Sequence, residues 1–109
     1  MKVALYCRVD RGGSEESQKE AIFMQKQRLE HYAKRNHLQI VGCYGDYGFP
    51  GYMLKRPGLM KLLDAFAAGE FDAVLVVNRK RLYRGDQSKE PKWPFQIYSL
   101  SQRQHQLER

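Results

Sequence analysis

The amino-acid sequence predicts a three-layer α/β domain, in which helices cover both faces of a mainly parallel sheet of about four or five strands. Short apolar runs alternate with stretches of helical periodicity, which is the order expected of β-α-β units. The run at residues 71–77 is apolar almost throughout, as in a strand buried on both faces. A length of 109 residues fits one domain and excludes a multidomain enzyme.

The first half of the chain predicts a strand, a helix and a second strand. Residues 3–9 form a short apolar run with β-branched and aromatic members, and a glycine turn follows at 10–13. A helix is expected from about Glu15 to Arg35, with a capping box at 17–20. One face of this helix would carry Ile22, Gln25, Leu29, Tyr32 and Ala33. Residues 38–44 predict the second strand.

The second half repeats the pattern after a loop at residues 45–52, which is too rich in glycine and proline for regular structure. Pro57 suits a first helical turn, and Gly69 suits a helix terminator. Between them an apolar stripe at helical spacing contains Leu59, Leu62, Leu63, Phe66 and Ala67. Residues 71–77 and 95–100 predict the last two strands, and 101–109 a polar tail that either starts a helix or is disordered.

Composition limits the possible partners. The formal net charge of +7 and a pI near 9.6 favour anions such as nucleic acid. No apolar run reaches the length of a membrane span, and the N-terminus lacks a secretory signal, so we expect a cytoplasmic protein without a membrane partner. Cys7 and Cys43 lie in apolar stretches and are expected to be buried free thiols. No metal-ligand spacing is present, and we assign neither metal nor cofactor.

Ligands of an open parallel sheet bind beyond the carboxyl ends of its strands. The residues expected at that edge are dominated by arginine, which holds phosphate oxygens in pairs. Arg8 is costly inside a core strand unless an anion pairs with it, and that anion is either a ligand or an internal carboxylate such as Asp46. Gln25 is either a buried amide satisfied by backbone or a residue that supports the site. The edge collects Arg8, Asp10, Asp46, Arg56, Arg79, Lys80, Arg81 and Arg84.

Other sites of phosphate chemistry fit less well. Gly12 and Gly13 do not complete a dinucleotide or P-loop motif. A phosphoryl-accepting signalling domain would need an acid where the third strand ends at Asn78. Arg81 and Arg84 are three residues apart, which on a helical turn would make a paired phosphate contact. Ser14 and Ser17 are most simply helix caps.

Five short motifs follow one another between Val3 and Arg84. They are Tyr6-x-Arg8-Val9, Gln25, Asp46-x-Gly48-x-Pro50-Gly51, Arg56-Pro57-Gly58-Leu59 and Lys80-Arg81-Leu82-x-Arg84. Together they resemble the catalytic domain of the serine recombinases, the resolvase/invertase family of site-specific DNA recombinases. The corresponding family patterns are Y-x-R-V-S, a glutamine of the first helix, D-x-G-x-S-G, R-P-G-L and D-R-L-x-R. The resemblance implies a resolvase-like (flavodoxin-like) fold over residues 1–100.

The resemblance also implies a chemistry. In the family a serine attacks a DNA phosphodiester without a metal and forms a phosphoserine link, while arginines stabilise the developing charge. The phosphate-contacting positions fall on Arg8, Arg56, Arg81 and Arg84. Supporting positions fall on Tyr6, Gln25 and Asp46. The implied partners are DNA and a second copy of the chain or another recombinase subunit, in a prokaryotic cell or one infected by a phage.

The chain departs from the family pattern at three positions. The nucleophilic serine is Asp10, the loop serine is Pro50, and the aspartate of D-R-L-x-R is Lys80. A carboxylate at ~4 Å from a phosphodiester is repelled by about 4 kcal/mol at an effective dielectric constant of about 20. An aspartyl-phosphate would also be a mixed anhydride rather than an ester that conserves the bond for rejoining.

Three hypotheses therefore stand. The first is a recombinase-like domain of a mobile element or phage that has lost strand cleavage and binds DNA or a partner. The second is an active recombinase with an atypical nucleophile, either Asp10 or a displaced Ser14. The third is a decayed fragment that only folds. Family members carry a dimer-forming helix and a helix-turn-helix after the catalytic domain, so the chain is expected to be either a fragment or a protein without its own sequence reader.

Overall fold

The computed structural model describes residues 1–101, and the tail expected at 101–109 lies outside the described residues from 102 onward. The described part contains a parallel sheet in the order β2-β1-β3-β4. Its principal elements are β1 (Lys2–Val9), α1 (Glu15–Arg35), β2 (Gln39–Tyr47), α2 (Pro57–Ala67), β3 (Ala73–Val76) and β4 (Gln96–Ser99). The predicted α/β class is confirmed.

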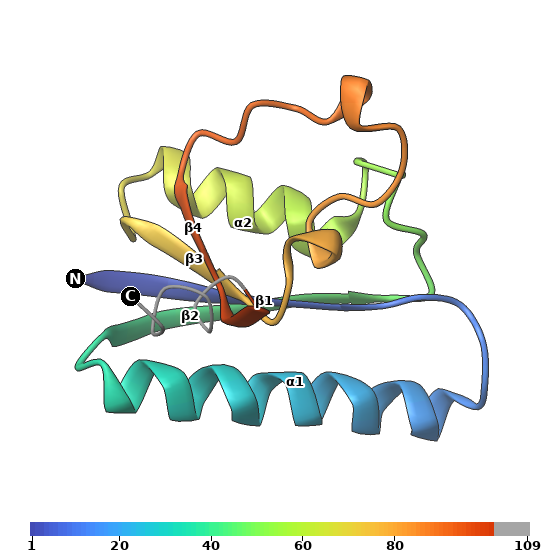
Figure 1. Cartoon of the computed structure of the whole chain (residues 1–109), viewed down its shortest axis with the longest axis horizontal. Coiled ribbons are helices and arrows are strands. Elements are labelled where there is room, and N and C mark those ends of the chain that lie inside the picture. Colours follow the sequence, from blue (N-terminus) through green and yellow to red (C-terminus); the bar gives the residue numbers. More distant parts are fainter. Residues whose placement is uncertain (102–109) are drawn as a thin grey trace.

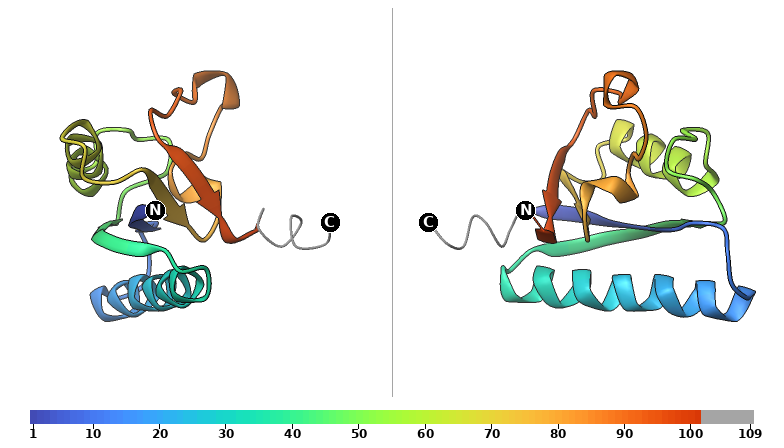
Figure 2. Two further views of the ribbon diagram at one scale, coloured as in Figure 1. Left: turned by 90° about the vertical axis from the view of Figure 1, so that its left-hand side faces the viewer. Right: turned by 45° about the vertical axis from the view of Figure 1, so that its right-hand side comes forward.

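The layers of the molecule are helix, sheet and helix. Helix α1 runs along one face of the sheet, and α2 lies on the other face together with the chain between β3 and β4 (Figure 1). The turned views keep the same three layers apart (Figure 2). Each face has its own apolar core, one built on Leu29 and Ala33 of α1 and the other on Leu59 and Leu62 of α2. Neither α1 nor α2 combines the length and apolar content that crossing a membrane requires.

Strand β1 is the centre of the sheet. It pairs with β2 along its whole length, from Lys2 to Val9, but with β3 only from Val3 to Leu5. The far half of β1 therefore has a strand neighbour on one side alone. This leaves Arg8, near the end of β1, open to contact with side chains from both helical layers.

Some element boundaries differ from those predicted. Strand β2 runs on to Tyr47, through residues predicted as loop, because residues 44–47 stay in register with the end of β1. Strand β3 is shorter than predicted, although all four of its residues are buried as expected. Helix α1 is capped by Ser14 rather than by the box at 17–20. On α2, Ala65 is buried in place of the predicted Ala67.

The prediction that both thiols are buried is wrong for Cys43. Cys7 is buried in the core under α1, whereas Cys43 lies exposed on the edge strand β2. A hydrogen bond from the Cys7 thiol lowers the pKa of Cys43 to about 7. The same contact and burial raise the pKa of Cys7.

Helix α2 begins in direct contact with β2, and this contact depends on Gly58. A Cβ atom at this position would collide with the carbonyl oxygen of Gly45 and lie 2.8 Å from Oδ2 of Asp46. The carbonyl belongs to the backbone of a strand, and the carboxylate is held by hydrogen bonds from Tyr6, Gly58 and Leu59. Only glycine lets the first turn of α2 approach the sheet this closely.

We predict that Gly58→Ala lowers the free energy of unfolding by about 2 kcal/mol, because overpacking outweighs the better helix propensity of alanine. Urea denaturation followed by circular dichroism measures the change. Met60→Ala removes a 45% exposed side chain from the same turn and is expected to change stability by less than about 1 kcal/mol. A Gly58→Ala variant as stable as the parent chain would contradict the close approach.

Candidate functional site

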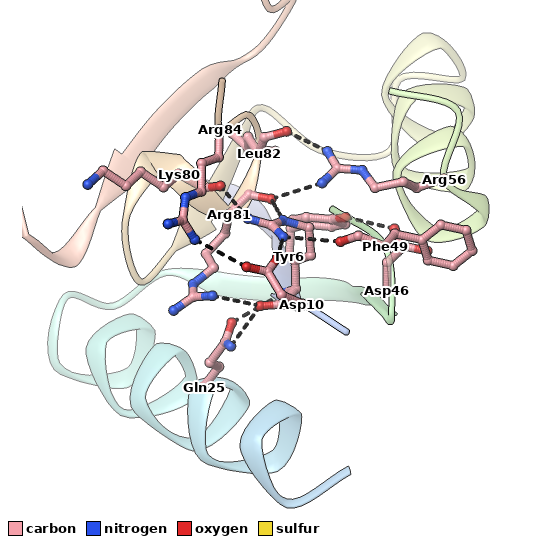
Figure 3. Close-up of polar contacts among 11 residues, drawn as sticks. Tyr6, Asp10, Gln25, Asp46, Phe49, Arg56, Lys80, Arg81, Leu82 and Arg84 are labelled. Carbon is pink, nitrogen blue, oxygen red and sulfur yellow. Dashed lines mark hydrogen bonds and ion pairs between the residues drawn. The ribbon is translucent and has the colours of Figure 1, made fainter. Parts of the chain in front are cut away.

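The residues predicted to carry function gather where β1 ends. Three segments meet there: the end of β1, the loop between β2 and α2, and a short 3₁₀ helix, η1 (Arg79–Arg81), that follows β3. Figure 3 shows their side chains turned toward one another across this edge of the sheet. The expected arginine cluster (Arg8, Arg56, Arg81 and Arg84) is thus brought together.

Arg8 is almost fully enclosed, with 1% of its surface exposed. Its Nε donates to the carbonyl oxygen of Arg81 at 2.9 Å and its Nη2 to that of Lys80 at 2.7 Å. Its Nη1 donates to the carbonyl of Phe49 at 3.2 Å and forms an ion pair with Asp10. The internal anion of Arg8 is therefore Asp10 and not Asp46.

Asp46 instead organises the start of α2. Its carboxylate accepts hydrogen bonds from the Tyr6 hydroxyl at 2.7 Å and from the backbone N–H groups of Gly58 and Leu59, at 2.7 and 2.9 Å. Arg56, at the N-cap position, makes no side-chain cap. A carboxylate from a neighbouring strand thus supplies the cap, where the helix dipole also favours negative charge.

Arg56 is fully buried and serves the backbone of the segment that follows η1. Its Nη2 donates to the carbonyl of Leu82 and its Nη1 to that of Arg81, the latter at 3.4 Å. The guanidinium also lies over the Tyr6 ring, 5.6 Å from its centroid, as a cation–π contact. Burial lowers the pKa of Arg56.

Gln25 is satisfied by backbone and supports the site at the same time, so the two interpretations of this residue coincide. Its Oε1 accepts from the Arg8 N–H at 3.2 Å and its Nε2 donates to the Arg8 carbonyl at 3.0 Å. The amide takes the place of a neighbouring strand beside the unpaired half of β1. It fixes α1 against the residue that anchors the arginine cluster.

Arg81 and Arg84 differ in their partners and in their exposure. Arg81 turns back to donate to the Arg8 carbonyl at 3.1 Å, and burial lowers its pKa. Arg84 has 64% of its side chain exposed, and its Nη1 lies 3.2 Å from Oδ2 of Asp10. Arg84 is therefore the member of the cluster that presents most of its side chain to solvent.

Asp10 lies at the front of the site and bridges two arginines. One carboxylate oxygen pairs with Arg8 and the other with Arg84, while 42% of the side chain remains exposed. Ser14 is occupied elsewhere, because its Oγ caps α1 by accepting from the Ser17 N–H at 3.0 Å. Residues 1–101 contain no group of three or more His, Cys, Asp or Glu side chains that could hold a metal ion.

Sequence reasoning missed the backbone acceptors of the site. Most of the hydrogen bonds that Arg8 and Arg56 donate go to four main-chain carbonyls, those of Phe49, Lys80, Arg81 and Leu82. Main-chain oxygens occur at every residue, so no pattern of residue types distinguishes these four. The one sequence signal was an arginine inside a core strand. A buried guanidinium needs hydrogen-bond acceptors, but this need does not identify the residues that supply them.

The fold and the site define the class as a three-layer α/β domain with an arginine-rich edge at the carboxyl ends of its parallel strands. The family model of the resolvase N-terminal domain matches residues 3–89, and the chain belongs to this family. The chain is thus a resolvase-type serine recombinase domain.

Solved structures agree with this membership. The N-terminal catalytic domain of TP901-1 integrase is 36% identical over 78% of this chain and 60% of that one, with a TM-score of 0.64. A serine recombinase from Sulfolobus solfataricus is 31% identical over 81% of this chain and 58% of that one, with a TM-score of 0.63. The catalytic domain of ISC1926 TnpA, an IS607-like serine recombinase, shares the fold at 23% identity, with a TM-score of 0.76 over 98% of this chain and 78% of that one.

The chain therefore spans about three fifths of the length of the TP901-1 catalytic domain that it matches.

Tyr6 generates a prediction about stability and pH. Burial, aided by the hydrogen bond to Asp46, raises the pKa of its hydroxyl far above the ordinary value near 10. Above about pH 10 the Tyr6 hydroxyl ionises in the unfolded chain but not in the folded one. The stability that its raised pKa contributes is therefore complete below about pH 10 and is lost as the pH rises further.

Tyr6→Phe is expected to cost about 2 kcal/mol of unfolding free energy near neutral pH, because a hydrogen bond to a carboxylate is lost. Above about pH 10 the difference from the parent chain should narrow by about 1.4 kcal/mol for each pH unit. Urea denaturation at about pH 8 and about pH 11 tests this, with Tyr52→Phe, an exposed tyrosine, as the control. An equal gap at both pH values would refute the role of Tyr6.

Proposed function

We propose that this domain binds a DNA phosphodiester at the arginine cluster without cutting the strand, as part of a recombination system of a mobile element or phage. The observation that carries the proposal is the Asp10 carboxylate, which pairs with Arg8 and Arg84. The resemblance to the family places its nucleophilic serine at this residue. The setting would be the cytoplasm of a prokaryotic host. A second recombinase subunit is the further partner proposed.

Positive charge around the site supports DNA as the ligand. Arg84 lies at the opening of the site, and exposed Arg79 and Lys80 precede it on η1. Together with a net charge of +7, they give the site the electrostatic character of a phosphate-binding surface. Arg8 and Arg56 serve this surface from behind, by holding the backbone from which these cations project.

The chemistry of Asp10 argues against strand cleavage. A carboxylate between two arginines already occupies the positive charge that would otherwise stabilise the phosphoryl transition state. Its own negative charge repels the incoming phosphodiester. Binding then depends on displacing part of an internal ion pair, so the domain holds DNA more weakly than the same site would without the carboxylate.

An active recombinase with another nucleophile is the second hypothesis. Ser14 is the nearest serine in the sequence to the family position, but its hydroxyl oxygen caps α1. Using it as a nucleophile would sacrifice this cap, which contributes about 1 kcal/mol in typical helices. The geometry therefore favours a structural role for Ser14.

Covalent capture on a nicked suicide duplex separates the two hypotheses. We expect no denaturation-resistant protein–DNA complex on a gel, either with the parent chain or with Ser14→Ala. A complex that is lost in Asp10→Ala and kept in Ser14→Ala would identify Asp10 as an active nucleophile and overturn the proposal. A complex lost only in Ser14→Ala would identify Ser14 as the nucleophile and would also overturn the proposal.

We predict that Asp10→Asn strengthens binding to a duplex about tenfold, which corresponds to about 1.4 kcal/mol. The substitution removes the negative charge and keeps nearly the same side-chain shape. Arg84→Ala should weaken binding and reduce its salt dependence. Fluorescence anisotropy of a labelled duplex at two salt concentrations measures both changes.

The matched control is Arg28→Ala, which removes the same charge from an exposed position on α1. If Arg84→Ala and Arg28→Ala lower the affinity equally, the arginine cluster is not the DNA site. If Asp10→Asn leaves the affinity unchanged, the carboxylate does not compete with phosphate.

A further inference from the structure

Next to Asp10 lies a second feature, an aromatic cavity that the arginine cluster does not explain. It has a volume of about 560 Å³ and is lined on one side by Phe49, Pro50, Tyr52 and Met53. Asp10, Arg11 and Gly48 complete its wall. Tyr52 is 68% exposed and Met53 43% exposed, and both line this one cavity.

The loop that carries this cavity is held firmly against the arginine cluster. The Arg84 N–H donates to the carbonyl of Gly51 at 3.1 Å, and the Met53 N–H donates to that of Pro50 at 3.1 Å. A Cβ atom on Gly51 would lie 2.7 Å from Nη2 of Arg8, so the loop backbone packs directly on that guanidinium. The backbone that carries the aromatic wall is thus held in place without a ligand, which reduces the entropic cost of binding.

Charge and apolar surface adjoin in a way that fits a nucleotide. Asp10 lines the cavity and lies 3.2 Å from Arg84, so the exposed cation and the aromatic wall share this residue as their boundary. Arg84 also lines a second cavity of about 750 Å³, together with Lys80, Arg79 and Glu90, and the last two form an ion pair at 3.8 Å. A cationic track for phosphates beside an aromatic surface for bases is the arrangement by which proteins bind single-stranded nucleic acid.

We propose that the cavity bordered by Phe49, Tyr52 and Met53 takes one unpaired base of DNA by stacking, while Arg84 holds the adjacent phosphate. The proposal rests on the proposed function, because the phosphate is that of the bound DNA. It adds a ligand class to the site: an unpaired nucleotide, besides the phosphodiester of a duplex. A base is uncharged near neutral pH, so the Asp10 carboxylate on the cavity wall does not repel it as it repels a phosphate.

The test compares two probes with equal numbers of phosphates. One is an oligothymidylate of about ten nucleotides, within the length that small single-strand-binding modules cover, and the other is the same strand made wholly of abasic residues. We expect the parent chain to bind the oligothymidylate about tenfold more tightly by fluorescence anisotropy. Tyr52→Ala should abolish this preference, and Tyr52→Phe, which keeps the ring, should retain it.

Phe23→Ala is the matched control, because Phe23 is 55% exposed but lies on α1. It is expected to leave the preference unchanged. Equal binding of both strands by the parent chain, no measurable binding of the oligothymidylate, or a Tyr52→Ala variant that keeps the preference would each overturn the proposal.

The two proposals fail in different ways. If the parent chain binds the duplex and the abasic strand through Arg84 but shows no preference for the oligothymidylate, the stacking site alone is refuted. If Arg84→Ala leaves the affinity for the duplex and for the abasic strand unchanged, the phosphate site is refuted. The proposal that Arg84 holds the phosphate next to the stacked base then fails as well.

Discussion

The buried guanidinium of Arg8 is the interaction on which the arrangement of this sheet edge depends. Removing a charge from water costs several kcal/mol unless good acceptors replace the solvent. Here the acceptors are Asp10 after β1, Phe49 in the loop after β2, and Lys80 and Arg81 in η1. Because these segments are far apart in the sequence, each hydrogen bond also fixes the position of a loop. The loops that form the site are held in place by the need to solvate one cation.

A second buried set completes the rigid rear of the site. Asp46 joins β1, β2 and the first turn of α2, and Arg56 joins that turn to the backbone after η1. The charges therefore divide into two groups with different tasks. Arg8, Arg56 and Asp46 are enclosed and position the backbone, whereas Asp10 and Arg84 reach solvent and can exchange partners. Of the two groups, only the second can bind a charged ligand without breaking hydrogen bonds that hold the backbone in place.

Sequence patterns predicted the layers of this domain and most of its elements, because apolar periodicity records which faces are buried. They misplaced the end of β2, where pairing with β1 overrides the loop preference of Gly45. The site was predicted as a set of residues but not as a set of contacts. Asp10 directly follows β1 and Asp46 lies near the end of β2, and nothing in residue type tells which carboxylate Arg8 meets. Register and twist decide that, and both are properties of the assembled sheet.

The carbonyl oxygen of Arg8 has a mechanical consequence. It accepts from Gln25 of α1 on one side and from Arg81 of the opposite layer on the other. A single main-chain atom thus couples the two helical layers across the sheet. If a ligand draws the Arg81 side chain outward, the same oxygen keeps only the hydrogen bond from Gln25, and this tie between the two layers is broken.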